Sequence, residues 1–235
     1  MKQQNYPPRH IAWCPLRSGW WWGTEECEQY EAAYWAGRVR PDVNKSSPLA
    51  NDHVFDDPAY AQETHYSSVL DLTQPLEAIW TGIRKSYHSI IHRANEEFRI
   101  VECCHADMAA FQSLHTRAND GFQPRNDLTY GHQANWLLNG SGMLVMGTCL
   151  FNDQIVAAAY WKLYQGCAYY GSGPSVERNV QHAVIWHSLE LLKARGITKV
   201  EMGQVDGVTG KEKNIGKFKS GFGTTVPYIV ATRGN

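Results

Sequence analysis

The clearest pattern of apolar and polar positions begins at residue 66. In "YSSVLDL" (66–72) the two kinds of residue alternate, and a period of two predicts a β-strand. Pro75 then opens a helix, because proline suits the first turn and the apolar residues after it recur every three or four positions. We expect one long helix with a single buried face, followed by the short strand "FRIVEC" (98–103). The residues of that face are Leu76, Ile79, Trp80, Ile83, Tyr87, Ile90, Ile91, Ala94 and Phe98.

Further along the chain the period switches between helix and strand. Two helices are expected, at 106–119 and 131–138. Short polar turns, "ND" and "QG", then separate three apolar runs and predict antiparallel hairpins over 142–151, 154–164 and 167–173. A periodic segment starting at Val180 predicts a helix that ends at Gly196. The last predicted elements are a strand at 198–203, a loop or short helix at 210–221, and a strand at 224–232.

This order predicts an α/β domain over 66–235. Its sheet is mixed and mostly antiparallel, it is flanked by helices, and one parallel pair of strands surrounds the helix that begins at Val180. Residues 1–65 differ in composition, because they are rich in aromatic, proline and turn residues, with one candidate helix at 24–37. We expect this part to be an N-terminal extension packed on the domain, since it is too rich in turns to form a core of its own.

Composition and charge narrow the function. The formal net charge of −1 argues against a protein that coats nucleic acid through bulk positive charge. The sequence has no run of eighteen apolar residues and no apolar stretch after "MKQQNYPPRH", so we expect a cytoplasmic protein without stable membrane insertion. The six cysteines lack C-x-x-C spacing, and neighbouring residues of a strand point to opposite faces, so "CCH" (103–105) favours reduced thiols over a metal site.

Four segments resemble a known family. "RKSYHSIIHRA" (84–94) approximates the R-K-x-x-x-x-I-x-R-A pattern of the FemABX family, through Arg84, Lys85, Ile91, Arg93 and Ala94. The hairpin that ends in "YYGSG", and the helix and strand in "HAVIWHSLELLKARGITKVEMG", are similar to FemABX segments. "IGKFKSGFG" (215–223) matches the closing signature I-x-x-F-K-x-G-F-G at every fixed position. The resemblance covers about residues 66–230, whereas typical members carry two such domains.

The resemblance implies the GNAT-like fold of acyl-CoA N-acyltransferases and a FemABX activity. Members of this family transfer an amino acid from aminoacyl-tRNA to an amine of a peptidoglycan precursor. The expected partners are therefore aminoacyl-tRNA and a phosphate-bearing or peptide acceptor, and no cofactor is expected. Two alternatives stay open, an N-acyltransferase that uses acyl-CoA on a small amine or modified nucleobase, and a catalytically inactive binding module.

Acyl transfer to an amine passes through a tetrahedral oxyanion, and the site must offer it positive charge or preorganised donors. It needs no protein nucleophile, which agrees with the absence of a G-x-S-x-G motif. By resemblance, Lys219 contacts the donor's ester carbonyl or terminal phosphate region and Phe218 shapes the donor channel. Asp206, in "QVDGVTG", is the candidate acceptor of the amine proton, with a solvated loop acid as the alternative.

The remaining candidates bind substrate. Tyr170 and Ser172 either form hydrogen bonds with the acceptor or pack within a hairpin. The basic residues Arg84, Lys85 and Arg93 either contact phosphates or form a solvated helix face. Arg178 begins the stretch that corresponds to the R/Q-x-x-G-x-G/A loop of CoA-binding enzymes. Gln181 replaces its central glycine, and we expect the Gln181 side chain to crowd a phosphate and to disfavour CoA. His182 and His187 are typical of surface or core helical residues.

Overall fold

The structure is a computed structural model that describes residues 43–45, 60–125, 127–164 and 166–233. The expected extension over 1–65, including its candidate helix, lies almost wholly outside the described residues. Strand β2 spans Tyr60–Asp71 and therefore begins six residues before the alternation that predicted it. No helix within the described part of the chain is long and apolar enough to cross a membrane.

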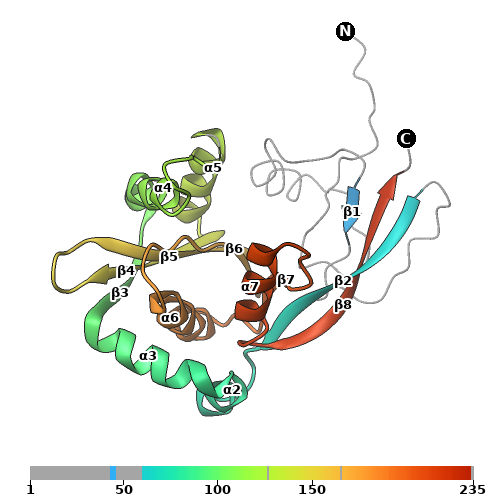
Figure 1. The fold of residues 1–235 in the computed structure, drawn as a ribbon, viewed down its shortest axis with the longest axis horizontal. Helices are drawn as coiled ribbons and strands as arrows, with labels where there is room; N and C mark the ends of the chain where they lie inside the picture. The colour runs from blue at the N-terminus through green and yellow to red at the C-terminus, as the bar shows by residue number, and fades with distance from the viewer. Residues whose placement is uncertain (1–42, 46–59, 126, 165, 234–235) are drawn as a thin grey trace, which may run out of the picture.

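One mixed sheet organises the described residues, with strand order β1-β8-β2-β7-β6-β5-β4-β3 (Figure 1). Every neighbouring pair is antiparallel except β6–β7, and this arrangement confirms the predicted fold class. The long strand β2 lies between β7 and β8 and pairs with both, so an early strand of the chain joins its last two strands. The other strands are β1 (Val43–Lys45), β3 (Phe98–Cys103), β4 (Gly142–Cys149), β5 (Ile155–Tyr164), β6 (Cys167–Ser172), β7 (Lys199–Gln204) and β8 (Thr224–Arg233).

Helices cover both faces of the sheet. On one face lie α2 (Leu76–Gly82), α3 (Lys85–Glu97) and α6 (Val180–Ala194), which pack into the larger hydrophobic cluster (Figure 1). On the other lie α4 (Met108–Arg117), preceded by the 3-10 turn His105–Asp107, and α5 (Asp127–Leu138), which contribute to a second cluster. Helix α7 (Gly210–Lys219) lies beside β7 and supplies the element expected as a loop or short helix.

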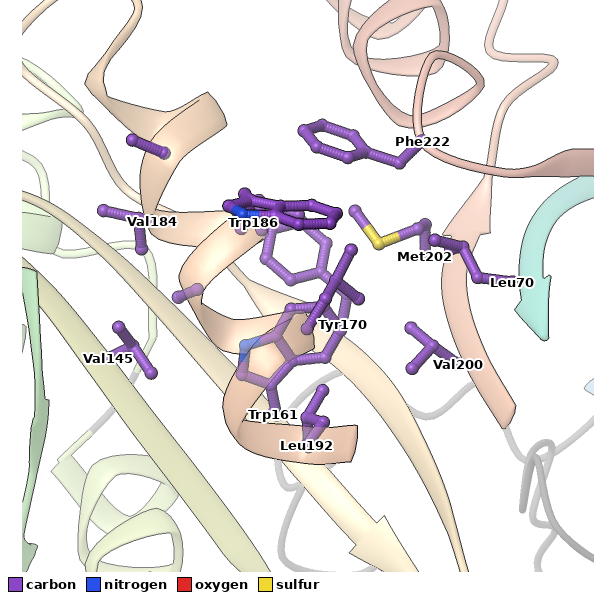
Figure 2. Close-up of a cluster of buried hydrophobic side chains, with 14 of the residues drawn as sticks. Leu70, Val145, Trp161, Tyr170, Val184, Trp186, Leu192, Val200, Met202 and Phe222 are labelled. Carbon is purple, nitrogen blue, oxygen red and sulfur yellow. The ribbon is translucent and has the colours of Figure 1, made fainter. Parts of the chain in front are cut away.

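The core beneath α6 is aromatic. Trp161 of β5 is fully buried and its ring centroid lies 5.2 Å from that of Tyr170 on β6 (Figure 2). Trp186 of α6 is also buried and makes an edge contact with Trp80 of α2 at 4.7 Å. These rings tie the sheet to its helical layer, because each aromatic side chain buries a large apolar area.

The prediction of a single helix after Pro75 is wrong, because the chain forms two helices there. Ile83 and Arg84 are extended, with ψ of 158° and 126°, and they separate α2 from α3. The break lets Ile83 enter the core while the backbone N–H of Arg84 donates to the carbonyl of Gly221 at 2.8 Å. That partner lies 137 residues away in sequence (221 − 84), so no local pattern announces the break.

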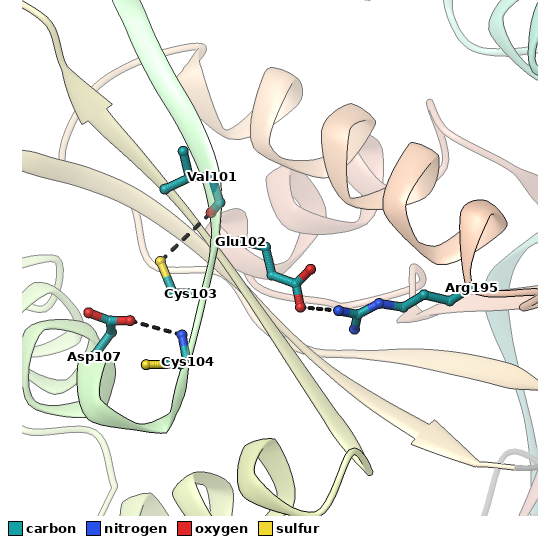
Figure 3. A network of polar contacts seen from close by, with 6 residues as sticks. All are labelled: Val101, Glu102, Cys103, Cys104, Asp107 and Arg195. Carbon is teal, nitrogen blue, oxygen red and sulfur yellow. Dashed lines mark hydrogen bonds and ion pairs between the residues drawn. The ribbon is translucent and has the colours of Figure 1, made fainter.

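The cysteines near the end of β3 make local contacts (Figure 3). The Cys103 thiol donates to the carbonyl of Val101 at 3.7 Å, and burial raises the pKa of this thiol to about 11. The Cys104 N–H donates to Asp107 Oδ2 at 2.8 Å and starts the 3-10 turn. Among the described residues, no group of three His, Cys, Asp or Glu side chains is placed to hold a metal.

Gly216 seats α7 against the end of β7. A Cβ at this position would lie 2.0 Å from the carbonyl oxygen of Val205, so only glycine permits the contact. We expect Gly216→Ala to destabilise the protein by about 1–3 kcal/mol, as overpacked sites do. Denaturant unfolding measures the change, with Gly210→Ala as the matched control, since a Cβ on Gly210 meets nothing within 4 Å. Equal stability of the two variants would contradict this close contact.

Candidate functional site

The site begins where two parallel strands separate. β6 and β7 pair only from Cys167–Lys199 to Tyr169–Glu201, and their ladder ends there. Helix α6 starts after β6 and α7 packs on β7, so the start of α6 and the last turn of α7 border the opening. A cleft of about 920 Å³ occupies this place, and its lining includes Tyr170, Ser172, Gln181, His182, Phe218 and Lys219.

Lys219 is one of three cationic residues that line the cleft, with Arg125 and Lys211. It is the last residue of α7, and its ammonium donates to the backbone carbonyl of Gln204 at 3.4 Å. Burial lowers the pKa of this lysine to about 8, and the nearby carboxylate of Glu201 opposes part of that shift. At neutral pH the side chain therefore still carries its proton, in surroundings where a charge interacts more strongly than in water.

Tyr169, which the sequence pattern did not mark as a site residue, lies beside this ammonium. A Cβ on Gly203 would lie 2.8 Å from Tyr169 Oη and 3.2 Å from Lys219 Nζ, so the hydroxyl and the ammonium share the space over this glycine. Glu201, on the same face of β7, is buried and accepts a hydrogen bond from Ser67 at 3.0 Å. Polar side chains of β6 and β7 therefore lie near the Lys219 ammonium, although Glu201 does not line the cleft itself.

Some residues of the segment "IGKFKSGFG" pack in the core, and others line the cleft. Phe222 is buried and Phe218 is half-buried, whereas Ile215 is 42% exposed. Ile215 lines the cleft instead. Gly221 and Gly223 are needed for close packing, because a Cβ on Gly221 would meet the Tyr87 ring at 2.3 Å and one on Gly223 would meet the carbonyl oxygen of Val69 at 2.5 Å.

Contrary to our expectation, the amide of Gln181 does not crowd the cleft. Its Nε2 donates to the backbone carbonyl of Ala158 at 2.9 Å and to Tyr170 Oη at 3.1 Å, so the amide is directed into the core. Burial raises the pKa of Tyr170. Tyr170 therefore borders the cleft with its hydroxyl already engaged, while the hydroxyl of Ser172 is buried there without a hydrogen-bond partner in the described structure.

His182 stands in an aromatic box at the start of α6. Its ring centroid lies 4.3 Å from that of Tyr87 and 4.9 Å from that of Phe218, both in edge contacts, and 6.2 Å from that of Phe222. Burial lowers the pKa of His182. A histidine in a helical pattern gives no sign of such a box, since Tyr87 and the phenylalanines come from distant segments.

The expected basic group is only partly brought together. Arg84 caps α3 and its Nη1 donates to Tyr87 Oη at 3.1 Å, and Tyr87 Oη in turn donates to the carbonyl of Phe218 at 3.1 Å. Arg84 thus supports the aromatic box from outside the cleft. Lys85 and Arg93 are exposed on α3, Arg178 is exposed before α6, and none of the three lines the cleft. Their contacts with phosphate stay predictions.

Asp206 is paired with a histidine instead of facing the cleft. Its Oδ2 lies 3.0 Å from His65 Nδ1, and Gln204 Nε2 lies 3.1 Å from the same nitrogen. Asp206 does not line the cleft, and its proposed role as proton acceptor is untested. Of the two catalytic candidates, the cleft contains Lys219, and of the seven substrate-binding candidates it contains Phe218, Tyr170 and Ser172.

No family model matches the sequence, and no curated protein matches it either. Solved structures do resemble the fold. FemX superposes with a TM-score of 0.58 at 12% identity, over 75% of this chain and 63% of that one. L-PGS from Bacillus licheniformis gives a TM-score of 0.52 at 12% identity, over 75% of this chain and 63% of that one. A conserved protein of unknown function from Bacteroides thetaiotaomicron gives 0.53 at 10% identity, over 74% and 62%.

This chain therefore spans a little under two thirds of the length of these structures. At such low identity the likeness concerns the fold. The sheet order, the helical layers and these superpositions together show that the chain has the predicted GNAT-like mixed α/β fold, which FemX and L-PGS share.

Proposed function

We propose that this chain is an acyltransferase of the FemABX type, which moves an amino acid from aminoacyl-tRNA to an amine of a peptidoglycan-precursor-like acceptor. The observation that carries the proposal is the position of Lys219, a desolvated cation in the cleft between the separating ends of β6 and β7. The likeness of the fold to FemX and to L-PGS supports the same class of reaction.

The reaction asks little covalent chemistry of the protein. The acceptor amine attacks the ester carbonyl of the donor, and the carbonyl oxygen becomes an oxyanion. The ammonium of Lys219 stabilises that oxyanion more strongly than a fully solvated lysine would, because partial burial reduces the screening of its charge by water. Phe218, the neighbour of Lys219 and a lining residue, forms an apolar wall for the donor. Collapse of the intermediate releases the hydroxyl of the tRNA and leaves the new amide.

Polar groups suited to an acceptor lie in the same cleft. The Ser172 hydroxyl is buried there and has no hydrogen-bond partner in the described residues, so an acceptor group would satisfy it. The exposed cations Lys85, Arg93 and Arg178 are the candidates for phosphates of the tRNA or of the acceptor. Such contacts add affinity through charge and are sensitive to salt.

A second function, acyl transfer from acyl-CoA, is favoured by one observation. The Gln181 amide is directed into the core, so it does not fill the space in front of the first turn of α6. Backbone N–H groups at a helix start are suited to a phosphate group. The replacement of glycine by Gln181 therefore argues against CoA less strongly than its sequence position suggested.

A transfer assay on the full chain separates these functions. We expect label from radioactive aminoacyl-tRNA to appear in a peptidoglycan-precursor peptide that has a free lysine amine. A parallel reaction contains labelled acetyl-CoA, and a reaction without peptide measures spontaneous ester hydrolysis. Transfer from acetyl-CoA alone would replace the first function with the second. No transfer from either donor would favour a binding module.

A further inference from the structure

The cleft needs a group that removes a proton from the attacking amine, and Lys219 cannot serve while it holds its own proton. We propose that Nε2 of His182 accepts this proton, a role that rests on the proposed function. His182 lines the same cleft as Lys219, and the ring of Phe218, the residue before Lys219, packs on it at 4.9 Å. Three properties suit this imidazole to the role: its tautomer, its charge and its immobility.

The tautomer follows from the partner of Nδ1. This nitrogen lies 3.1 Å from the backbone carbonyl oxygen of Asn179, and a carbonyl can only accept. Nδ1 therefore carries the hydrogen in the neutral ring, and Nε2 keeps a lone pair. Asn179 caps α6 in the left-handed region, with φ of 73°, which is a strained conformation for a residue other than glycine. The unusual cap directs the carbonyl that fixes the ring.

The charge of the ring is set by its surroundings. Burial is the largest cause that lowers the pKa of His182 below the ordinary value of 6.5, and the positive charge of Arg84 lowers it further. The hydrogen bond to the backbone carbonyl of Asn179 acts in the opposite direction and raises the pKa. Most other charges that border the ring or the cleft are positive as well. The titratable and charged groups described there are Arg84 before α3, Tyr87 of α3, Lys211 and Lys219 of α7, Tyr169 and Tyr170 of β6, Arg125, and the acids Glu177 and, beside Lys219, Glu201. At neutral pH the imidazole is therefore an unprotonated base.

The aromatic box holds this base in place. Tyr87 and Phe218 contact the ring by their edges, and Tyr87 is itself fixed by its hydrogen bond to the carbonyl of Phe218 at 3.1 Å. A fixed base costs less reorganisation at the moment of proton transfer than a mobile one. Asp206, the acceptor expected from the sequence, lies 3.0 Å from His65 and does not line the cleft.

The step balances without another reactant. As the C–N bond forms, the amine proton moves to Nε2 of His182. As the ester C–O bond breaks, the imidazolium returns that proton to the leaving oxygen and becomes neutral again. The products are the amide and the free hydroxyl of the donor, and Lys219 stays protonated throughout. General acid–base catalysis of this kind contributes roughly 10²–10⁴-fold to a rate.

The kinetic test compares two histidines of one helix. We expect His182→Gln to lower the single-turnover rate with labelled aminoacyl-tRNA and the lysine peptide by about a hundredfold. The wild-type rate is expected to rise with pH as His182 loses its proton. With the same acceptor amine, the His182→Gln variant is expected to lack this part of the rise. His187→Gln, at a site on α6 that is 37% exposed and 3.5 Å from Glu190, is the matched control and keeps the wild-type profile. A folded His182→Gln protein with the control's rate and profile would overturn the proposal.

A second measurement needs neither activity nor a stable variant. Long-range ¹H–¹⁵N spectra of the full chain with labelled histidine are expected to show His182 neutral at pH 7, with hydrogen on Nδ1 and none on Nε2. A hydrogen on Nε2 at pH 7 overturns the proposal even in an active protein. If the wild-type chain transfers nothing, the proposed function fails, whereas an unprotonated Nε2 still supports His182 as the proton acceptor of this cleft.

Discussion

Lys219→Met is expected to leave the fold intact and to lower the single-turnover transfer rate by about two orders of magnitude. Removal of one donor to an oxyanion typically costs about 2.7–4 kcal/mol of barrier, and methionine retains the length of the side chain without its charge. Because burial lowers the pKa of Lys219 to about 8, the wild-type rate should also fall as the pH rises through that value and the ammonium disappears. Lys217→Met, at an exposed position of α7, is the control and should do little.

The same substitution is expected to stabilise the protein at pH 7. The pKa of Lys219 is lower in the folded state than the usual 10.5, so the unfolded chain binds more protons between about pH 8 and 10.5. Wild-type stability therefore rises with pH across this window, and below it the buried charge is a cost that methionine removes. Urea unfolding at pH 7 and 10 measures both effects. A near-normal rate in folded Lys219→Met would remove this lysine from the mechanism.

Trp161→Ala should destabilise the protein by about 3–5 kcal/mol, the range for removal of a large aromatic side chain from a core. Trp161 is completely buried among residues of the larger cluster, and its indole nitrogen has no hydrogen-bond partner within the described structure, so packing supplies nearly all of its contribution. Figure 2 shows it beneath α6, next to Tyr170. The loss is large because neighbouring strands cannot move together to fill the cavity.

Guanidinium unfolding of Trp161→Ala measures this cost. Phe151→Ala is the matched control, since Phe151 is 96% exposed in the turn between β4 and β5 and its removal leaves no cavity. A loss below 1 kcal/mol for Trp161→Ala would show that the core relaxes around the deletion. The Tyr170 ring packs against Trp161, so the rate of transfer in the folded variant reports whether this support reaches the cleft.

The sequence predicted the sheet and most helices because their signals are local. Alternation gave β2 and the hairpins, and the helical period gave α6 with its end at Gly196, whose φ is 77°. The break between α2 and α3 was missed because its cause is not local. The backbone N–H of Arg84 donates to the distant carbonyl of Gly221, whereas the apolar residues on both sides of the break keep a helical spacing.

The candidate site was predicted in the same uneven way. Lys219 and Phe218 were found through a motif that keeps them together, and the cleft contains both. His182 and Tyr169 lie in segments that resemble the family, but nothing in those segments marks them as site residues, because their importance comes from side chains that meet only in three dimensions. The direction of the Gln181 amide depends on the carbonyl of Ala158 on a strand, which the residue type alone does not reveal.

The pairing of β2 with β7 and β8 has a consequence for the order of folding. Strands β3 to β6 join sequence neighbours and close small loops, whereas Ser67 must find Gln204 and Val69 must find Thr224 across most of the chain. Loops this long close slowly, so the hairpin half of the sheet is expected to form first. The cleft lies on the boundary between the two halves. A chain trapped before the late pairing would present Tyr170 and Ser172 without a seated Lys219. It would be a compact species with most of its structure and an incomplete cleft.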